Sequence, residues 1–250
     1  HNMGLTQFTR FEMMPKGRLI EMGNMINKLQ ARNFKFGALY LYSKILNLVH
    51  AYDLLETEGL YAFSHYIESL KAREKKGKAV LAILDNPSII AAKRIADEAL
   101  ERGEEHPKVF ALVDILKSNP GKSAIVFVQY RSTIKMLVEV LTKNGSTAHA
   151  FVGKKEGVTQ EQQKQVIADF RARKFDVLVS SSIGEEGLDI PSVDFVVFYE
   201  PIPSEIRNIQ RRGRTGRLYQ GEIYLLVTNG TKDQVYFFIS GSILLFKVIL

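Results

Sequence analysis

The strongest constraint on the fold lies in the second half of the chain, where short apolar runs alternate with helical periodicity. Residues 124–128 are five consecutive apolar residues, and comparable runs rich in β-branched side chains occupy residues 176–180, 193–199 and 222–228. Strands that are apolar on both faces are typical of a parallel sheet covered by helices. We therefore expect an α/β fold whose ligands gather at the carboxyl ends of its strands.

The segments between these runs have the spacing and the boundary residues of helices. Pro107 marks the change of pattern, and Asn119, Pro120 and Gly121 follow the first expected helix. A fifth strand is expected at residues 147–152. The expected helices occupy residues 108–118, 132–143 and 159–173, and a further helix begins at residue 204.

The first hundred residues have a different texture, because helical spacing persists from Leu19 to Arg102 and strand-like alternation is absent. Helical stretches are expected at residues 60–73 and 89–102, with a start signal at Pro87 and Ser88 and a stop at Gly103. We therefore expect an all-helical domain over residues 1–105 and an α/β domain over residues 106–250.

Composition excludes several classes of site. The chain contains no cysteine, which excludes disulfides, thiolate metal sites and cysteine nucleophiles and fits an intracellular, cytoplasmic protein. The 34 Lys and Arg residues against 27 Asp and Glu give a net charge of +7, which favours a polyanionic partner but is also common among proteins that bind none. The start lacks the pattern of a signal peptide, and the apolar stretch 235–250 is too short and interrupted to span a bilayer. We expect no membrane association, and we expect this stretch to pack on the domain or on a partner.

The most specific motif is QRRGRTGR, which occupies residues 210–217. Four arginines in eight residues concentrate positive charge, and the two glycines allow close approach of the backbone to a ligand. The guanidinium group is a planar, permanently charged fork that matches phosphate oxygens. The alternatives are a solvated basic helix end or a plain nucleic-acid patch, but the full string after a strand and a helix favours a phosphate site.

Two further clusters follow predicted strands. Residues 180–191, SSSIGEEGLDIP, offer hydroxyl groups for a phosphate, a glycine at 187 and a carboxylate at Asp189 that suits a ribose hydroxyl. By itself this segment also fits an ordinary strand–helix loop. Residues 127–133, FVQYRST, offer polar donors for a phosphate backbone, but by themselves they are better explained by an ordinary helix N-cap at Ser132 or Thr133.

In order and spacing, the three clusters resemble motifs IV, V and VI of superfamily 2 helicases, which lie in the second of two RecA-like domains. The GVTQEQQ string at residues 157–163, GEEGLDIP at 184–191 and YEPIPSEIR at 199–207, which leads into QRRGRTGR, resemble most closely the archaeal Hef and Fanconi-anaemia M translocase branch. The similarity runs from about residue 105 to about residue 228. The helical first hundred residues stand where that branch has a thumb-like helical insertion domain.

The resemblance implies a role for individual residues and an ATP and Mg²⁺ requirement. The phosphates of ATP would face Gln210, Arg214 and Arg217, with the two arginines as the finger pair. The ribose would contact Asp189, and the nucleotide edge would contact Gly187. The residues implied for the nucleic-acid track are Gln129, Arg131, Gly153 and Ser181.

Two other strings resemble nucleotide-binding motifs only superficially. Gly121, Lys122 and Ser123 match the end of a phosphate loop, but Leu116 stands where the earlier glycine is required and a strand follows. Residues 97–100, DEAL, resemble a metal-binding DEAH box but lie within an expected helix, where we interpret them as a solvated face. The sequence therefore contains neither a Walker A lysine nor a Walker B acid pair, the groups that would hold Mg²⁺.

The resemblance thus implies the C-terminal half of an ATP-dependent DNA helicase or translocase that acts on branched or forked DNA in repair. Mg²⁺ would be held by a first RecA-like lobe, and this chain alone is expected to be inactive as an ATPase. Two alternatives stay open: an RNA-directed helicase of the RIG-like type, and a non-catalytic module that binds nucleic acid or a partner. The basic run 71–78 fits either a DNA contact or a solvated loop equally well.

Overall fold

The computed structural model describes residues 16–29, 32–152, 158–181, 192–201, 219–240 and 247–249. The chain divides into two compact units, His1–Glu104 and Glu105–Leu250. The division falls next to the boundary expected from the change of sequence pattern at Pro107. Each unit is built around its own buried side chains, and the two are described in turn.

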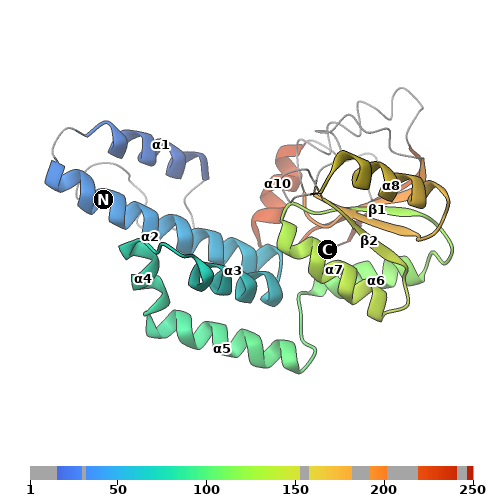
Figure 1. Ribbon diagram of the computed structural model, residues 1–250, viewed down its shortest axis with the longest axis horizontal. Helices are drawn as coiled ribbons and strands as arrows, with labels where there is room; N and C mark the ends of the chain where they lie inside the picture. Colours follow the sequence, from blue (N-terminus) through green and yellow to red (C-terminus); the bar gives the residue numbers. More distant parts are fainter. Residues whose placement is uncertain are drawn as a thin grey trace. The chain divides into compact units, whose positions relative to one another are not determined.

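Helices alone form the described part of the first unit (Figure 1): α1 (Lys16–Asn27), α2 (Arg32–Thr57), α3 (Leu60–Ala72), α4 (Lys78–Leu84) and α5 (Pro87–Glu101). Two small clusters of buried side chains hold it together. Leu19 and Met22 of α1 pack with Val49 of α2. Ala51 of α2 packs with Phe63 of α3 and Ala96 of α5. This unit confirms the expected helical module.

The helix α5 begins and ends with the residues that its sequence indicates. Asn86 caps the amino end, where its side chain accepts a hydrogen bond from the Ser88 N–H at 2.9 Å, and Pro87 occupies the first helical position. The helix ends just before Gly103, whose φ of 78° lies in the left-handed region that glycine adopts without strain.

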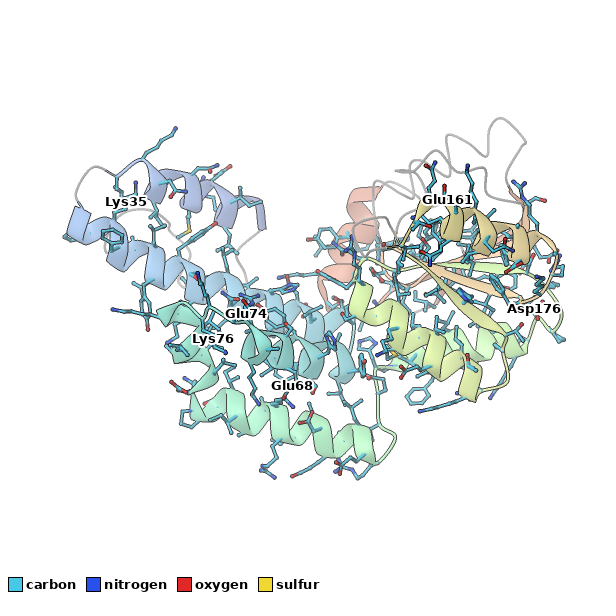
Figure 2. All side chains as sticks on the ribbon, viewed as in Figure 1. Lys35, Glu68, Glu74, Lys76, Glu161 and Asp176 are labelled. Carbon is cyan, nitrogen blue, oxygen red and sulfur yellow. The ribbon has the colours of Figure 1, made fainter. Side chains whose placement is uncertain are left out.

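The DEAL string lies on α5, where Asp97 joins two helices rather than facing solvent alone. Asp97 accepts a hydrogen bond of 2.5 Å from Ser64 Oγ of α3 and pairs at 2.5 Å with Lys93 Nζ. The same ammonium group lies 2.9 Å from the Glu68 carboxylate of α3, which Figure 2 labels beside α5. The interpretation as a merely solvated face was therefore incomplete, because spacing along one helix does not show what a neighbouring helix contributes.

The second unit is a parallel α/β structure. Its sheet has the strand order β2-β3-β1-β4-β5-β6, and every pair of neighbours is parallel. The strands are β1 (Ala124–Phe127), β2 (Ala148–Phe151), β3 (Val177–Ser180), β4 (Val193–Phe198), β5 (Tyr219–Leu226) and β6 (Lys247–Ile249); the described helices are α6 (Pro107–Lys117), α7 (Arg131–Lys143), α8 (Gln160–Arg171) and α10 (Lys232–Ser240).

Helices cover both faces of the sheet, which explains why its central strands are apolar on both faces along most of their length. On one face, Phe127, Phe198 and Leu225 form a buried cluster with Ile167 and Phe170 of α8, and Phe237 of α10 packs against it. The alternate strand residues, Val126 among them, point to the other face, where α6 and α7 lie (Figure 1). The expected α/β fold with a parallel sheet is confirmed.

Several elements were not predicted individually, and α1 and α4 are two of them, although both lie largely in the segment expected to be helical. The short helix α4 follows the basic run 71–78, whose charged residues at 73–76 lie between α3 and α4 (Figure 2). At the other end of the chain, α10 runs into the apolar stretch 235–250 and the edge strand β6 lies inside it, whereas this stretch was expected only to pack on the domain or on a partner. No helix in the described parts of the chain combines the length and apolarity needed to cross a bilayer.

Candidate functional site

The carboxyl edge of the sheet brings together three of the residues singled out from the sequence. Gln129 and Arg131 follow β1, and Ser181 follows β3 directly. These strands are neighbours, since Phe127 is in register with Ser180 and the Val128 N–H donates to the Ser180 carbonyl at 2.9 Å. The start of the 180–191 cluster and the 127–133 cluster therefore lie on neighbouring strands.

The side chains of Gln129 and Arg131 are exposed, whereas the strand that carries them is fully buried. The helix α7 begins at Arg131, with Tyr130 at its N-cap and no side-chain hydrogen bond to cap it. The expected cap at Ser132 or Thr133 is wrong, because both residues lie inside the first turn. An amide, a guanidinium group and an uncapped helix start thus meet at one exposed point, which suits contact with a phosphate backbone.

The backbone beside this point is held by a buried acid that sequence reasoning missed. Glu200 follows β4 and is 3 % exposed, and its Oε1 accepts a hydrogen bond from the Gln129 N–H. One residue earlier, the Tyr199 N–H donates to the Phe127 carbonyl at 2.9 Å. The end of β1 is therefore tied to β4 on one side and to β3 on the other.

A buried ion pair lies at the same edge. Lys108 of α6 is 4 % exposed and Asp233 of α10 is 2 % exposed, and Lys108 Nζ lies 2.5 Å from Asp233 Oδ2. The same ammonium nitrogen is 5.2 Å from the centroid of the Tyr199 ring. Asp233 Oδ2 also accepts the Thr228 N–H, just past β5, at 3.1 Å. A Lys–Asp pair in this setting fixes two helices against the strand ends.

Residues 121–123, which superficially resemble the end of a phosphate loop, lie at the opposite edge of the sheet. Ser123 immediately precedes β1, and both its N–H and its Oγ donate to Asp194 Oδ2, at 2.6 and 2.9 Å. Arg173 Nη2 is 3.1 Å from the same oxygen. The pKa of Asp194 is held below its ordinary value, chiefly by the hydrogen bond from the Ser123 backbone and against the effect of partial burial. Ser123 is thus hydrogen-bonded to Asp194 at the amino edge of the sheet, whereas parallel sheets bind their ligands at the carboxyl edge.

A buried side-chain hydrogen bond joins the end of β2 to α8. Thr159 and Gln162 form a reciprocal capping box at the start of α8. The next residue, Gln163, is 1 % exposed, and its Nε2 donates to the Val152 carbonyl at 2.9 Å. This bond anchors α8 to the residue that precedes Gly153.

The remaining candidate residues lie outside the described residues: Gly153, Gly187, Asp189, Gln210, Arg214 and Arg217. The chain enters their segments from the carboxyl ends of β2, β3 and β4, after Val152, Ser181 and Pro201 respectively. Within the described residues, no group of three His, Asp or Glu side chains is placed to hold a metal ion.

The sequence alone did not single out Glu200, Lys108 and Gln163, because each lies within a longer segment that was interpreted as a whole. For Glu200 and Lys108, the signal that could have found them is a charged residue next to an apolar run, whereas Gln163 stands among polar residues and has no such signal. Glu200 directly follows the buried strand 193–199, and Lys108 stands among apolar residues of α6. A charged residue in such a position is rarely buried unless it has a partner.

Two family models match the chain in sequence order. Residues 2–99 match the family described as "ATP-dependent RNA helicase, helical bundle", and residues 107–219 match the "Helicase conserved C-terminal domain". Between them, the matches cover most of both compact units.

Individual relatives match almost the whole chain. A protein of Methanocaldococcus jannaschii that is named as an ATP-dependent RNA helicase is 39% identical over 229 residues, which are 89% of this chain and 29% of that protein. The ATP-dependent DNA helicase mph1 of Sclerotinia sclerotiorum is 32% identical over 262 residues, which are 94% of this chain and 21% of that protein. The crystal structure of the Pyrococcus furiosus Hef helicase domain is 39% identical with a TM-score of 0.76, and covers 96% of this chain and 51% of that chain. The chain thus spans less than a third of the two curated relatives.

Proposed function

Because the chain belongs to the Hef and Fanconi-anaemia M branch of the superfamily 2 helicases, we propose that it forms the C-terminal half of the motor of an ATP-dependent DNA helicase or translocase. The α/β unit has the RecA-like fold of the helicase C-terminal lobe, and the helical module precedes it. We further propose that the complete enzyme acts inside the cell, in the cytoplasm, on branched or forked DNA in repair. The observation that carries the proposal is the likeness to the Hef helicase domain across both units.

The nucleic-acid track is proposed to run along the carboxyl edge of the sheet. Gln129, Arg131 and Ser181 would contact one strand there, with Gly153 beside them. The exposed amide and guanidinium groups after β1 and the hydroxyl after β3 support this role, because they are donors for phosphate oxygens on adjacent strands. Such contacts read the backbone rather than the bases, so binding should depend little on sequence and strongly on salt.

The nucleotide site is proposed to be shared with another RecA-like lobe. Arg214 and Arg217 would reach the γ-phosphate of ATP with Gln210 beside them, while Asp189 and Gly187 would contact the ribose and the nucleotide edge. An arginine in this position stabilises the charge that develops on the transferring phosphoryl group. The first lobe would hold Mg²⁺, since this sequence has neither of the Walker groups that bind it.

The test is ATP hydrolysis by the full-length protein with different nucleic acids. Forked DNA should stimulate hydrolysis, and Arg217→Ala should lower the stimulated rate by about 10³-fold or more while the protein still binds DNA. A protein that is not stimulated by any DNA, or whose rate is unchanged by Arg217→Ala, would contradict the proposal.

An RNA-directed activity is the second candidate, because the helical-bundle family and the M. jannaschii relative carry RNA helicase names. Forked DNA competed against double-stranded RNA, at the same salt concentration, separates the two. Displacement of bound forked DNA by an equal concentration of double-stranded RNA, together with stronger stimulation by that RNA, would favour the RNA-directed helicase. A non-catalytic module instead predicts no ATPase when the other lobe is supplied in trans.

A further inference from the structure

We infer that Glu200 is a positioning residue of the nucleic-acid track, which it sets through the backbone of Gln129. The inference rests on the proposed function, because it gives the buried acid a part in binding DNA along the carboxyl edge. Glu200 does not itself face that edge, since it is 3 % exposed. It acts on residues that do.

The hydrogen bond from Gln129 is placed where it controls the exposed side chains. Gln129 leaves the end of β1, and only Tyr130 separates it from Arg131, the first residue of α7. The Val128 N–H is already bonded to β3 through the Ser180 carbonyl. The bond from the Gln129 N–H to Glu200 fixes the next peptide, so the direction in which the chain turns from strand into helix is set by Glu200.

A preset turn strengthens binding because the chain need not be ordered when the nucleic acid arrives. Ordering a loop at an interface weakens binding, and rigid elements reduce that loss. The helix start at Tyr130 has no side-chain cap to hold it. The Glu200 carboxylate restrains this turn from the β4 side.

The chain offers a matched control at the other end of the same two strands. Asp194 accepts the N–H of Ser123, which precedes β1, as Glu200 accepts the N–H of Gln129, which follows it. Both bonds join residues 71 positions apart, across the same β1–β4 pair. Loss of either acid weakens the same strand pairing, but only Glu200 adjoins the carboxyl edge.

The experiment measures DNA-stimulated ATP hydrolysis by the full-length protein as the concentration of a single-stranded oligonucleotide rises. Glu200→Ala should raise the half-maximal DNA concentration about tenfold, the effect of losing one hydrogen bond to a charged group. The rate at saturating DNA should change by less than about twofold, because the restraint affects binding rather than the phosphoryl transfer. Asp194→Ala should leave the half-maximal concentration within about twofold of the wild type.

Two further variants separate positioning from charge and from folding. Glu200→Gln keeps an oxygen that can accept the Gln129 N–H, so it should bind DNA more tightly than Glu200→Ala. In a Gln129→Ala/Arg131→Ala background, Glu200→Ala should add less than about twofold, because the side chains through which it acts are gone. Circular dichroism melting of each variant identifies any that has lost its fold.

Several results would overturn the inference. A folded Glu200→Ala protein with an unchanged half-maximal concentration, or a tenfold effect that persists without Gln129 and Arg131, excludes positioning through the turn. Tighter binding by both Glu200 variants would mean that the carboxylate only repels phosphate. An equal loss in Asp194→Ala would mean a general effect on the sheet. A wild-type protein without any DNA stimulation would overturn the proposed function, and this inference with it.

Discussion

Asp194 and Glu200 stand at opposite ends of β4, and each accepts the backbone N–H of a residue that flanks β1. Asp194 binds Ser123 at the amino end, and Glu200 binds Gln129 at the carboxyl end. The two acids thus brace one parallel strand pair at both of its ends. They differ in surroundings, because the Asp194 side chain is 41 % exposed and Glu200 is almost wholly buried.

Asp194→Asn should lower the free energy of unfolding in a pH-dependent way. The pKa of Asp194 is held down mainly by the Ser123 N–H, so the stabilisation is present above the unfolded-state pKa and is lost as pH falls through the folded-state value. We expect a loss of about 1 kcal/mol at neutral pH, a low figure for a charged hydrogen bond because the carboxylate is partly solvated. The difference from the wild type should shrink below about pH 4. Urea unfolding between acid and neutral pH measures it, and a constant difference over that range would contradict the assignment.

Lys108→Met should lower the free energy of unfolding far more than a surface substitution, because it leaves the buried Asp233 carboxylate without its ion-pair partner. Asp233 is 2 % exposed and would keep its bond to the Thr228 N–H but lose the ammonium group. Breaking a buried pair from one side costs about 3–5 kcal/mol. Adding Asp233→Asn should restore part of the loss, because the amide oxygen can still accept the Thr228 N–H. Urea unfolding of the single and double variants provides the comparison, and equal losses would mean that the two residues are not coupled.

The ion cluster of the helical unit gives a second pH dependence, with two limits. Partial burial acts against the charge of Lys93, but the hydrogen bonds and charges of Asp97 and Glu68 raise its pKa overall. Partial burial likewise acts against the charge of Asp97, but the hydrogen bonds from Lys93 and Ser64 and the nearby lysine charges lower its pKa overall. The contribution of Lys93 is therefore present below its unfolded-state pKa and lost as pH rises, while that of Asp97 is lost in acid.

Lys93→Met should accordingly destabilise the protein between these limits and much less outside them. The unfolding free energy should fall by about 1 kcal/mol from roughly pH 5 to pH 10, and the difference should narrow below about pH 4 and above about pH 10.5. Thermal melting across that range tests the shape. Arg94→Met, which removes an exposed pair with Glu98, is the matched control and should change stability little at any pH.

The sequence predicted those features that depend on neighbouring residues, and it did not predict those that depend on residues far apart in the chain. The helix α5, capped by Asn86 and stopped before Gly103, and the apolar run of β1 were predictable because their signals are local. The bond between Gln129 and Glu200 depends on β1 lying between β3 and β4, which no periodicity reveals. The predicted cap of α7 at Ser132 or Thr133 is wrong: the helix begins at Arg131 after Tyr130, and the preceding residue, Gln129, is bonded through its N–H to Glu200, which is 71 positions away in the sequence.

Arg131→Ala should weaken binding of single-stranded DNA and make it less sensitive to salt. Each phosphate contact that is lost reduces the slope of log affinity against log salt by about 0.7 on single strands. Different oligonucleotide sequences should lose affinity equally, because the contact is to the backbone. Fluorescence anisotropy at several salt concentrations measures both effects, with Lys143→Ala at the far end of α7 as the control. An unchanged salt slope would remove Arg131 from the proposed track.

The 250-residue chain by itself should hydrolyse ATP no faster than background, with or without DNA. The sequence supplies the arginines 214 and 217 but no Walker A lysine and no Walker B acids, so the groups that hold the phosphates and Mg²⁺ must come from another lobe. Phosphate release should appear when a purified first lobe with both Walker motifs is added in excess, and Arg217→Ala in this chain should abolish it. Hydrolysis by the isolated chain that disappears with Arg217→Ala would mean that the active site is complete here. If the mixed lobes release no phosphate, although circular dichroism shows that both are folded and both bind DNA, the result would instead favour a non-catalytic module.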